Sequence, residues 1–123
     1  MNITLWILQV LLALAFLAHG LLFISPPAQI AAQMNAMLPR WFQLFLGIAE
    51  VLAAIGLTLP GITRIRPALV PAAAVGIMIV MICATALHLW RREFSAAVTT
   101  IVLLALATFV AYGRWRRLPI PAR

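Results

Sequence analysis

The chain has 123 residues, of which 66 % are hydrophobic and only 9 % are charged. Soluble domains carry roughly one quarter charged residues, and one of this length could not bury so much apolar surface. The net charge of +7 comes from nine arginines at the ends of apolar runs, without the basic face or reading motif of a nucleic-acid-binding protein. The composition therefore predicts a single transmembrane domain over residues 1–123, with the lipid bilayer and no nucleic acid as its partner.

Four apolar runs of ~18–24 residues are each long enough to cross the hydrocarbon core as helices. They cover about residues 3–24, 41–59, 67–90 and 95–112, and residues 113–123 form a basic C-terminal tail. Prolines indicate where the predicted helices begin and end. The Leu-Pro-Gly sequence that ends at Gly61 is expected to end the second run, and Pro67 suits the first turn of the third. The predicted fold class is all-α, an integral membrane four-helix transmembrane bundle.

The connection between the first and second runs has a pattern of its own. Ile30, Met34 and Met37 recur at helical spacing, with polar residues between them. This pattern predicts a short amphipathic helix that lies at the membrane interface between spans one and two. The alternative is a loop that carries some apolar residues, because the amphipathic character is modest.

The arginines predict the orientation. Four spans place the N-terminus, the second connection and the C-terminal tail on one side of the membrane. That side holds six arginines and the other side three, so we expect both termini in the cytoplasm and the chain in the cytoplasmic (plasma) membrane. The six are Arg64, Arg66, Arg114, Arg116, Arg117 and Arg123, and the three are Arg40, Arg91 and Arg92.

Glu50 is an acid near the middle of the second run. An ionised side chain at a helix centre costs roughly 2.5–3.5 kcal/mol on insertion, so Glu50 needs shelter or a purpose. It shares a helical face with Gln43, Gly47 and Ala54. Because small residues let a neighbouring helix approach, Gly47 and Ala54 are predicted to support packing, and Glu50 is predicted to face the bundle interior.

Antiparallel spans bring further polar groups towards the same outer half of the membrane. They are His19, Gln43, Glu50, His88 and Glu93. Because ionisable groups inside a membrane mark functional sites by default, these residues form a candidate polar site. The alternative is a purely structural role, in which a buried carboxyl hydrogen-bonded to a histidine or an arginine fixes how the helices pack.

Three ligand chemistries suit a glutamate and two histidines between helices. A quinone could dock with its carbonyl oxygens held by a histidine and a protonated carboxyl. A haem bound by His19 and His88 is disfavoured, because their depths differ by about a turn and no supporting motif is present. A metal is not expected either, since no histidine pair has ligand spacing, and the single Cys83 excludes a cysteine-pair motif. No cofactor is therefore certain.

Four segments, in this order and spacing, resemble the DoxX-like family: FLAHGLLF, LGIAEVLAAIGLTLPG, MICATALHLWRRE and VAYGRW. The resemblance implies a four-helix integral membrane protein. The matching positions are Gly47, Glu50, Pro60, His88, Glu93, Gly113 and Arg114.

The namesake of that family is described as the small subunit of a quinone-linked, sulfur-oxidising membrane complex. The resemblance therefore implies an accessory subunit of a membrane redox system, with a polar site around Glu50 that faces a quinone and no activity of the chain on its own. Its partner would be another membrane protein or a second copy of the chain. The alternative is a non-catalytic scaffold or a chaperone-like partner of other membrane proteins.

Overall fold

The computed structural model of the protein describes residues 2–122, and every regular element in that range is helical. The predicted all-α class is thereby confirmed. A π-helical turn, η1 (Gly113–Arg117), follows the last α-helix directly. The α-helices are α1 (Asn2–Ile24), α2 (Ala28–Met37), α3 (Arg40–Thr63), α4 (Leu69–Trp90) and α5 (Phe94–Tyr112).

Four of the helices are long and apolar enough to cross a membrane: α1, α3, α4, and α5 together with η1. Each spans 22 to 24 residues, which at ~1.5 Å per residue matches the thickness of the hydrocarbon core. Their outward faces expose large apolar side chains such as Leu14, Ile48 and Ile79. This surface is suited to lipid, and the predicted four-span membrane protein is confirmed.

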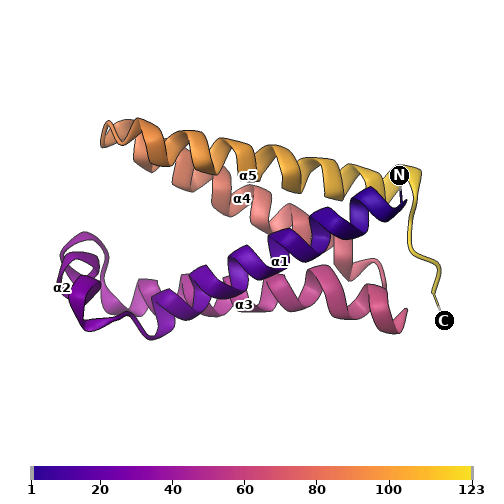
Figure 1. Cartoon of the computed structure of the whole chain (residues 1–123), viewed down its shortest axis with the longest axis horizontal. Coiled ribbons are helices and arrows are strands. Elements are labelled where there is room, and N and C mark those ends of the chain that lie inside the picture. Colours follow the sequence, from indigo (N-terminus) through magenta and orange to yellow (C-terminus); the bar gives the residue numbers. More distant parts are fainter. Residues whose placement is uncertain (1, 123) are drawn as a thin grey trace.

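The spans form two antiparallel pairs. Helix α1 packs along α3, and α4 packs along α5, while α3 with α4 and a shorter contact of α1 with α5 join the pairs. Figure 1 shows that the pairs lie close together where both chain termini are found and spread apart at the opposite end. We call these the termini end and the α2 end, because α2 lies at the tip of the α1–α3 pair.

The core runs between the pairs. It combines large side chains, such as Leu12, Phe16 and Ile77, with alanines that let the helices approach. Within the α4–α5 pair, the hydroxyl groups of Thr85 and Thr100 lie 2.7 Å apart and form a hydrogen bond. This hydrogen bond is a polar contact within the α4–α5 pair.

The end of α3 differs from the prediction. The helix does not stop at Leu59 but continues through Pro60 to Thr63, and Arg64 ends it in the left-handed conformation with φ 60°. A proline removes one backbone N–H and therefore one helical hydrogen bond, which α3 tolerates four residues from its end. The proline was wrongly predicted to end the span.

The start of α4 and the C-terminal tail also differ. Helix α4 begins at Leu69 rather than Pro67, so Pro71 is the proline in its first turn, where the backbone N–H has no helical partner anyway. The predicted tail is in part helix, since η1 extends the last span to Arg117. Gly113 makes this possible, because a Cβ atom there would lie 2.7 Å from Cδ2 of Leu5.

Candidate functional site

The carboxyl group of Glu50 is held by His19. Glu50 is only 4 % exposed, and both of its carboxylate oxygens lie 3.0 Å from Nδ1 of His19. An ionised Glu50 thus accepts the Nδ1–H of the imidazole. Glu50 stands ten residues into α3, about 15 Å along the helix axis, so the acid–imidazole pair lies near the middle of the membrane.

The pair exists because α1 and α3 cross at two glycines. A Cβ atom on Gly20 would lie 2.7 Å from the carbonyl oxygen of Gly47, and one on Gly47 would lie 2.8 Å from the carbonyl oxygen of Gly20. His19 precedes Gly20, and Glu50 lies on the same face of α3 as Gly47, one turn further along. The close approach of the two backbones therefore sets the distance between the imidazole and the carboxyl group.

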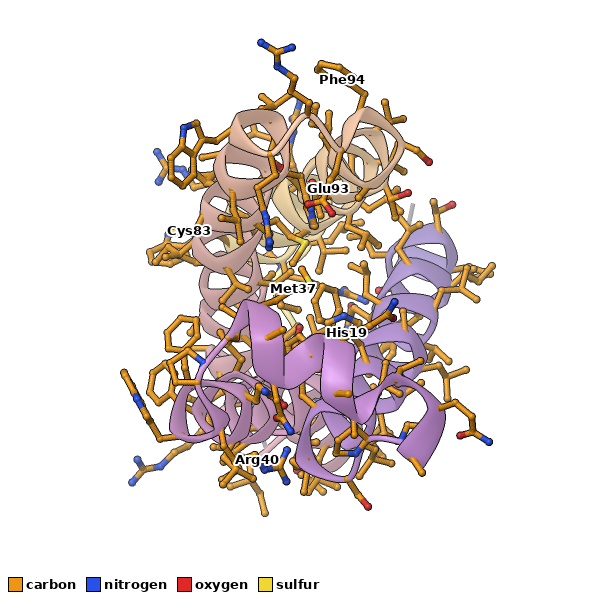
Figure 2. All side chains as sticks on the ribbon, turned by 90° about the vertical axis from the view of Figure 1, so that its left-hand side faces the viewer. His19, Met37, Arg40, Cys83, Glu93 and Phe94 are labelled. Carbon is orange, nitrogen blue, oxygen red and sulfur yellow. The ribbon has the colours of Figure 1, made fainter. Side chains whose placement is uncertain are left out.

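The other side of the imidazole is accessible. The side chain of His19 is 50 % exposed, and its ring stacks at a tilt on Phe23 with 4.6 Å between the ring centroids. Figure 2 views the molecule from the α2 end and shows His19 beyond α2, between that helix and the α4–α5 pair. Among residues 2–122, no side chain or backbone group hydrogen-bonds to Nε2 of His19. The imidazole can exchange a proton there.

Glu50 also lines a groove between α3 and α4. The groove has a volume of about 630 Å³ and extends from Glu50 and Val80 to Pro60 and Leu69. Glu50 is the single ionisable residue among those that line it. Glu50 therefore borders an apolar groove on the α4 side, while both of its carboxylate oxygens are directed at the imidazole on the α1 side.

Gln43 is buried, but it bonds to α2 and its connection rather than to Glu50. Its Nε2 donates to Oδ1 of Asn35 at 3.0 Å and to the carbonyl oxygen of Leu38 at 2.9 Å. Arg40 donates to Oε1 of Gln43 at 3.3 Å and to the carbonyl oxygen of Phe23 at 2.8 Å, at the end of α1. These bonds fix the α2 end of the α1–α3 pair and explain the polarity of Gln43.

His88 and Glu93 form a second acid–imidazole pair, which is local to the α4–α5 connection. Nδ1 of His88 lies 3.1 Å from Oε1 of Glu93. Figure 2 shows Glu93 at the α4–α5 connection, apart from His19. Within the part of the chain that the structure describes, no hydrogen bond links this pair to Glu50, and no three His, Cys, Asp or Glu side chains gather as a metal site.

The structure thus divides the candidate residues into three groups. His19 and Glu50 form the intramembrane pair, His88 and Glu93 form the connection pair, and Gln43 holds α2. Gly47 and Ala54 are both buried on the face of α3 that carries Glu50. The groove was not anticipated, because it depends on how α3 packs against α4.

A further polar network lies at the termini end. Arg114 is 3 % exposed, and its Nε donates to Oε1 of Gln9 at 2.6 Å, while Nε2 of Gln9 donates to the carbonyl oxygen of Leu57 at 2.7 Å. The guanidinium also donates to Oδ1 of Asn2 at 2.7 Å and lies over the ring of Trp6. Gln9, a glutamine inside an apolar run, is the sequence signal for this network, which was not predicted.

The model of the DoxX-like family matches residues 7–110, which include most of α1 and α5 and all of α2, α3 and α4. No curated protein and no solved structure matches the chain.

Proposed function

The chain belongs to the DoxX-like family, and from this starting point we propose that it is an accessory subunit of a membrane redox system. In this proposal the His19–Glu50 pair faces a quinone that enters from the lipid through the groove between α3 and α4. The observation that carries the proposal is that Glu50, a buried acid hydrogen-bonded to a half-exposed imidazole, is among the residues that line an apolar groove.

The depth of Glu50 favours a neutral ligand head. A charged headgroup is held at the membrane surface by its hydration, whereas a quinone carries only uncharged carbonyl oxygens and can reach the middle of the bilayer. A carbonyl oxygen accepts hydrogen bonds, and in this proposal Glu50, which is among the residues lining the groove, donates one when it carries a proton. The pair therefore matches the head of a quinone better than that of a phospholipid.

The same pair supplies a route for protons. Reduction of a quinone to a hydroquinone takes up two electrons and two protons, and in this proposal a redox centre of the partner protein supplies the electrons. Glu50 gives its proton to a quinone oxygen and regains one from Nδ1 of His19, which is protonated at Nε2 from the accessible side. The imidazole ring then reorients before it carries the next proton. The chain alone has no enzymatic activity in this scheme.

The orientation follows from the arginines. Five of those in the described residues lie at the termini end and three at the α2 end, and this excess supports our proposal that both termini lie in the cytoplasm of a cell whose plasma membrane holds the protein. His19 is nearer the α2 end, so the pair exchanges protons with the outer side. The five are Arg64, Arg66, Arg114, Arg116 and Arg117.

The test is quinone binding by the purified protein in lipid nanodiscs. We expect Glu50→Gln to weaken binding by about tenfold, equivalent to ~1.4 kcal/mol, because the amide cannot pass a proton and pairs differently with His19. Glu93→Gln is the matched control, since it changes the other acid–imidazole pair, and it should bind like the wild type. If Glu50→Gln lowers only the thermal stability and leaves binding intact, the pair is structural and the proposal fails.

A non-catalytic scaffold for other membrane proteins is the second candidate. It is favoured by α2, none of whose residues is buried and whose exposed face, with Gln29, Gln33 and Met37, is available for a partner. The two functions differ in which substitution releases a partner protein. Under the scaffold proposal, replacing the exposed Met37 with serine would release a co-purifying membrane protein, while Glu50→Gln would retain it.

A further inference from the structure

We propose that the groove between α3 and α4 is the binding site for the prenyl tail of a quinone, with the tail running from Glu50 towards the termini end. This inference rests on the proposed function, because the head of the same molecule is bound by the His19–Glu50 pair. It specifies the class of substrate as a quinone with a long linear chain of prenyl units, and it gives the direction in which this chain lies.

The residues that line the groove run lengthwise along both helices, as a site for an extended chain requires. On α3 it extends from Glu50 to Pro60, ten residues or ~15 Å along the helix, and on α4 from Val80 to Leu69. The lining residues include glycine and alanine on both helices: Gly56 packs closely against Ala73, whereas Gly76 borders open space. A slot of this length with one polar end suits a linear molecule with one polar end.

Glu50, at the polar end of the groove, favours a prenyl quinone over the acyl chain of a phospholipid. A phospholipid acyl chain that entered the groove would bring only methylene or methyl groups to Glu50, because the charged headgroup remains at the membrane surface. Glu50 would then gain no polar partner from the molecule in the groove. A prenyl quinone places its carbonyl oxygens against Glu50 and its tail along the apolar part of the groove.

The bound tail would be stabilised by van der Waals contacts with the groove rather than by the hydrophobic effect. Lipid chains are as apolar as the groove, so binding inside a membrane depends on close contact. The floor of the groove is buried, with Phe16 at 3 % and Ile77 at 2 % exposure, whereas Leu52 and Leu59 at its edges are 62 % and 53 % exposed. A seated tail would contact the floor and remain open to lipid on one side, so a quinone can enter sideways.

Gly76 allows the groove to be filled without disturbing the helices. It lines the groove, and a Cβ atom added there meets no other atom within 4 Å. Gly76→Leu therefore occupies the space of the tail, and Gly76→Met does so with a more flexible side chain, in case the leucine variant folds poorly. Gly76→Ala is the matched control, because a single methyl group leaves the groove open.

The experiment measures equilibrium binding of three tritiated probes to the protein in nanodiscs. The probes are a benzoquinone with a long prenyl tail, the same benzoquinone without a tail, and a prenyl alcohol with the same tail. We expect Gly76→Leu and Gly76→Met to weaken binding of the tailed quinone by about tenfold relative to Gly76→Ala. The tailless quinone should bind all three variants alike, and Glu50→Gln should weaken both quinones.

The outcomes separate the two proposals. If the tailed quinone binds Gly76→Leu and Gly76→Met as tightly as it binds Gly76→Ala, the groove does not hold the tail, although the head site stands. If the prenyl alcohol binds through the groove while neither quinone binds, the tail site stands and the redox function is wrong. If no probe binds the wild-type protein, both proposals are overturned.

Discussion

Replacement of Gly20 by alanine should separate His19 from Glu50 without changing either residue. A Cβ atom on Gly20 would lie 2.7 Å from the carbonyl oxygen of Gly47 and 3.0 Å from Cγ2 of Val51, where ordinary contact begins at 3.4 Å. The carbonyl oxygen belongs to the backbone, so the helices must move apart by about 0.7 Å at this point.

A shift of that size is enough to break the pair. The distances from Nδ1 of His19 to the two carboxylate oxygens of Glu50 are 3.0 Å, and an increase of about 0.7 Å takes them beyond hydrogen-bonding range. Forcing extra volume into a packed interface costs ~1–3 kcal/mol, and a lost hydrogen bond within a membrane adds ~0.6 kcal/mol. We expect Gly20→Ala to lower the free energy of unfolding by about 2–4 kcal/mol.

The assay combines unfolding in mixed micelles with nitrogen NMR of the histidine rings. The Nδ1 resonance of His19 should move towards that of a ring without a carboxylate partner, while the resonances of His88 stay in place. Gly76→Ala is the control, since its added methyl group meets nothing within 4 Å. Wild-type stability together with an unchanged His19 resonance in Gly20→Ala would refute the view that this crossing positions the pair.

Three further predictions concern the remaining polar groups. Gln43→Ala should destabilise the protein by ~1–3 kcal/mol and speed proteolysis next to α2, because it leaves Asn35 and the carbonyl oxygen of Leu38 without their partner; unchanged proteolysis would contradict this. Arg114→Met should destabilise by a similar ~1–3 kcal/mol, whereas the double variant with Gln9→Leu should lose less than the sum of the two single losses in a thermodynamic cycle. Reporter enzymes fused to the C-terminus should be active only in the cytoplasmic form, and activity outside would reverse the proposed orientation.

The existence of the spans could be predicted from the sequence because it depends on local composition. Runs of ~20 apolar residues must be helical in lipid whatever they pack against. The burial of Glu50 followed from a helical face with Gly47 and Ala54, and the structure gives 4 % exposure for Glu50. The prediction that α3 ends at Pro60 was wrong because proline removes only one helical hydrogen bond. The remaining hydrogen bonds of a long helix are enough to continue it.

The partners of the polar residues could not be predicted, because they depend on which helices pair. Antiparallel spans put His19 and His88 in the same half of the membrane, but α1 packs on α3 whereas α4 packs on α5. Each histidine therefore has its own carboxylate, Glu50 or Glu93. The depth of a residue in the membrane can be predicted from its position in an apolar run. Which helices pair depends on the shapes of their packed faces, which the sequence does not give directly.

One pattern on α3 does connect sequence to pairing. Gln43, Glu50 and Leu57 recur every seven residues, and each is hydrogen-bonded to α1 or to α2 and its connection: Gln43 to Asn35, Glu50 to His19, and the carbonyl oxygen of Leu57 to Gln9. A seven-residue repeat keeps one face of a helix against the same neighbour. The bonds at Glu50 and Leu57 thus join α3 to α1, and the bond at Gln43 joins α3 to α2.

The contact between α3 and α4 has a different character. Across residues 2–122, no side-chain hydrogen bond joins these two helices, and their contact contains the groove beside Glu50. Movement of the α4–α5 pair against the α1–α3 pair would therefore widen the groove without breaking the bond between His19 and Glu50. In the proposed function, the ligand enters from the lipid at this contact, while the bond between His19 and Glu50 stays intact.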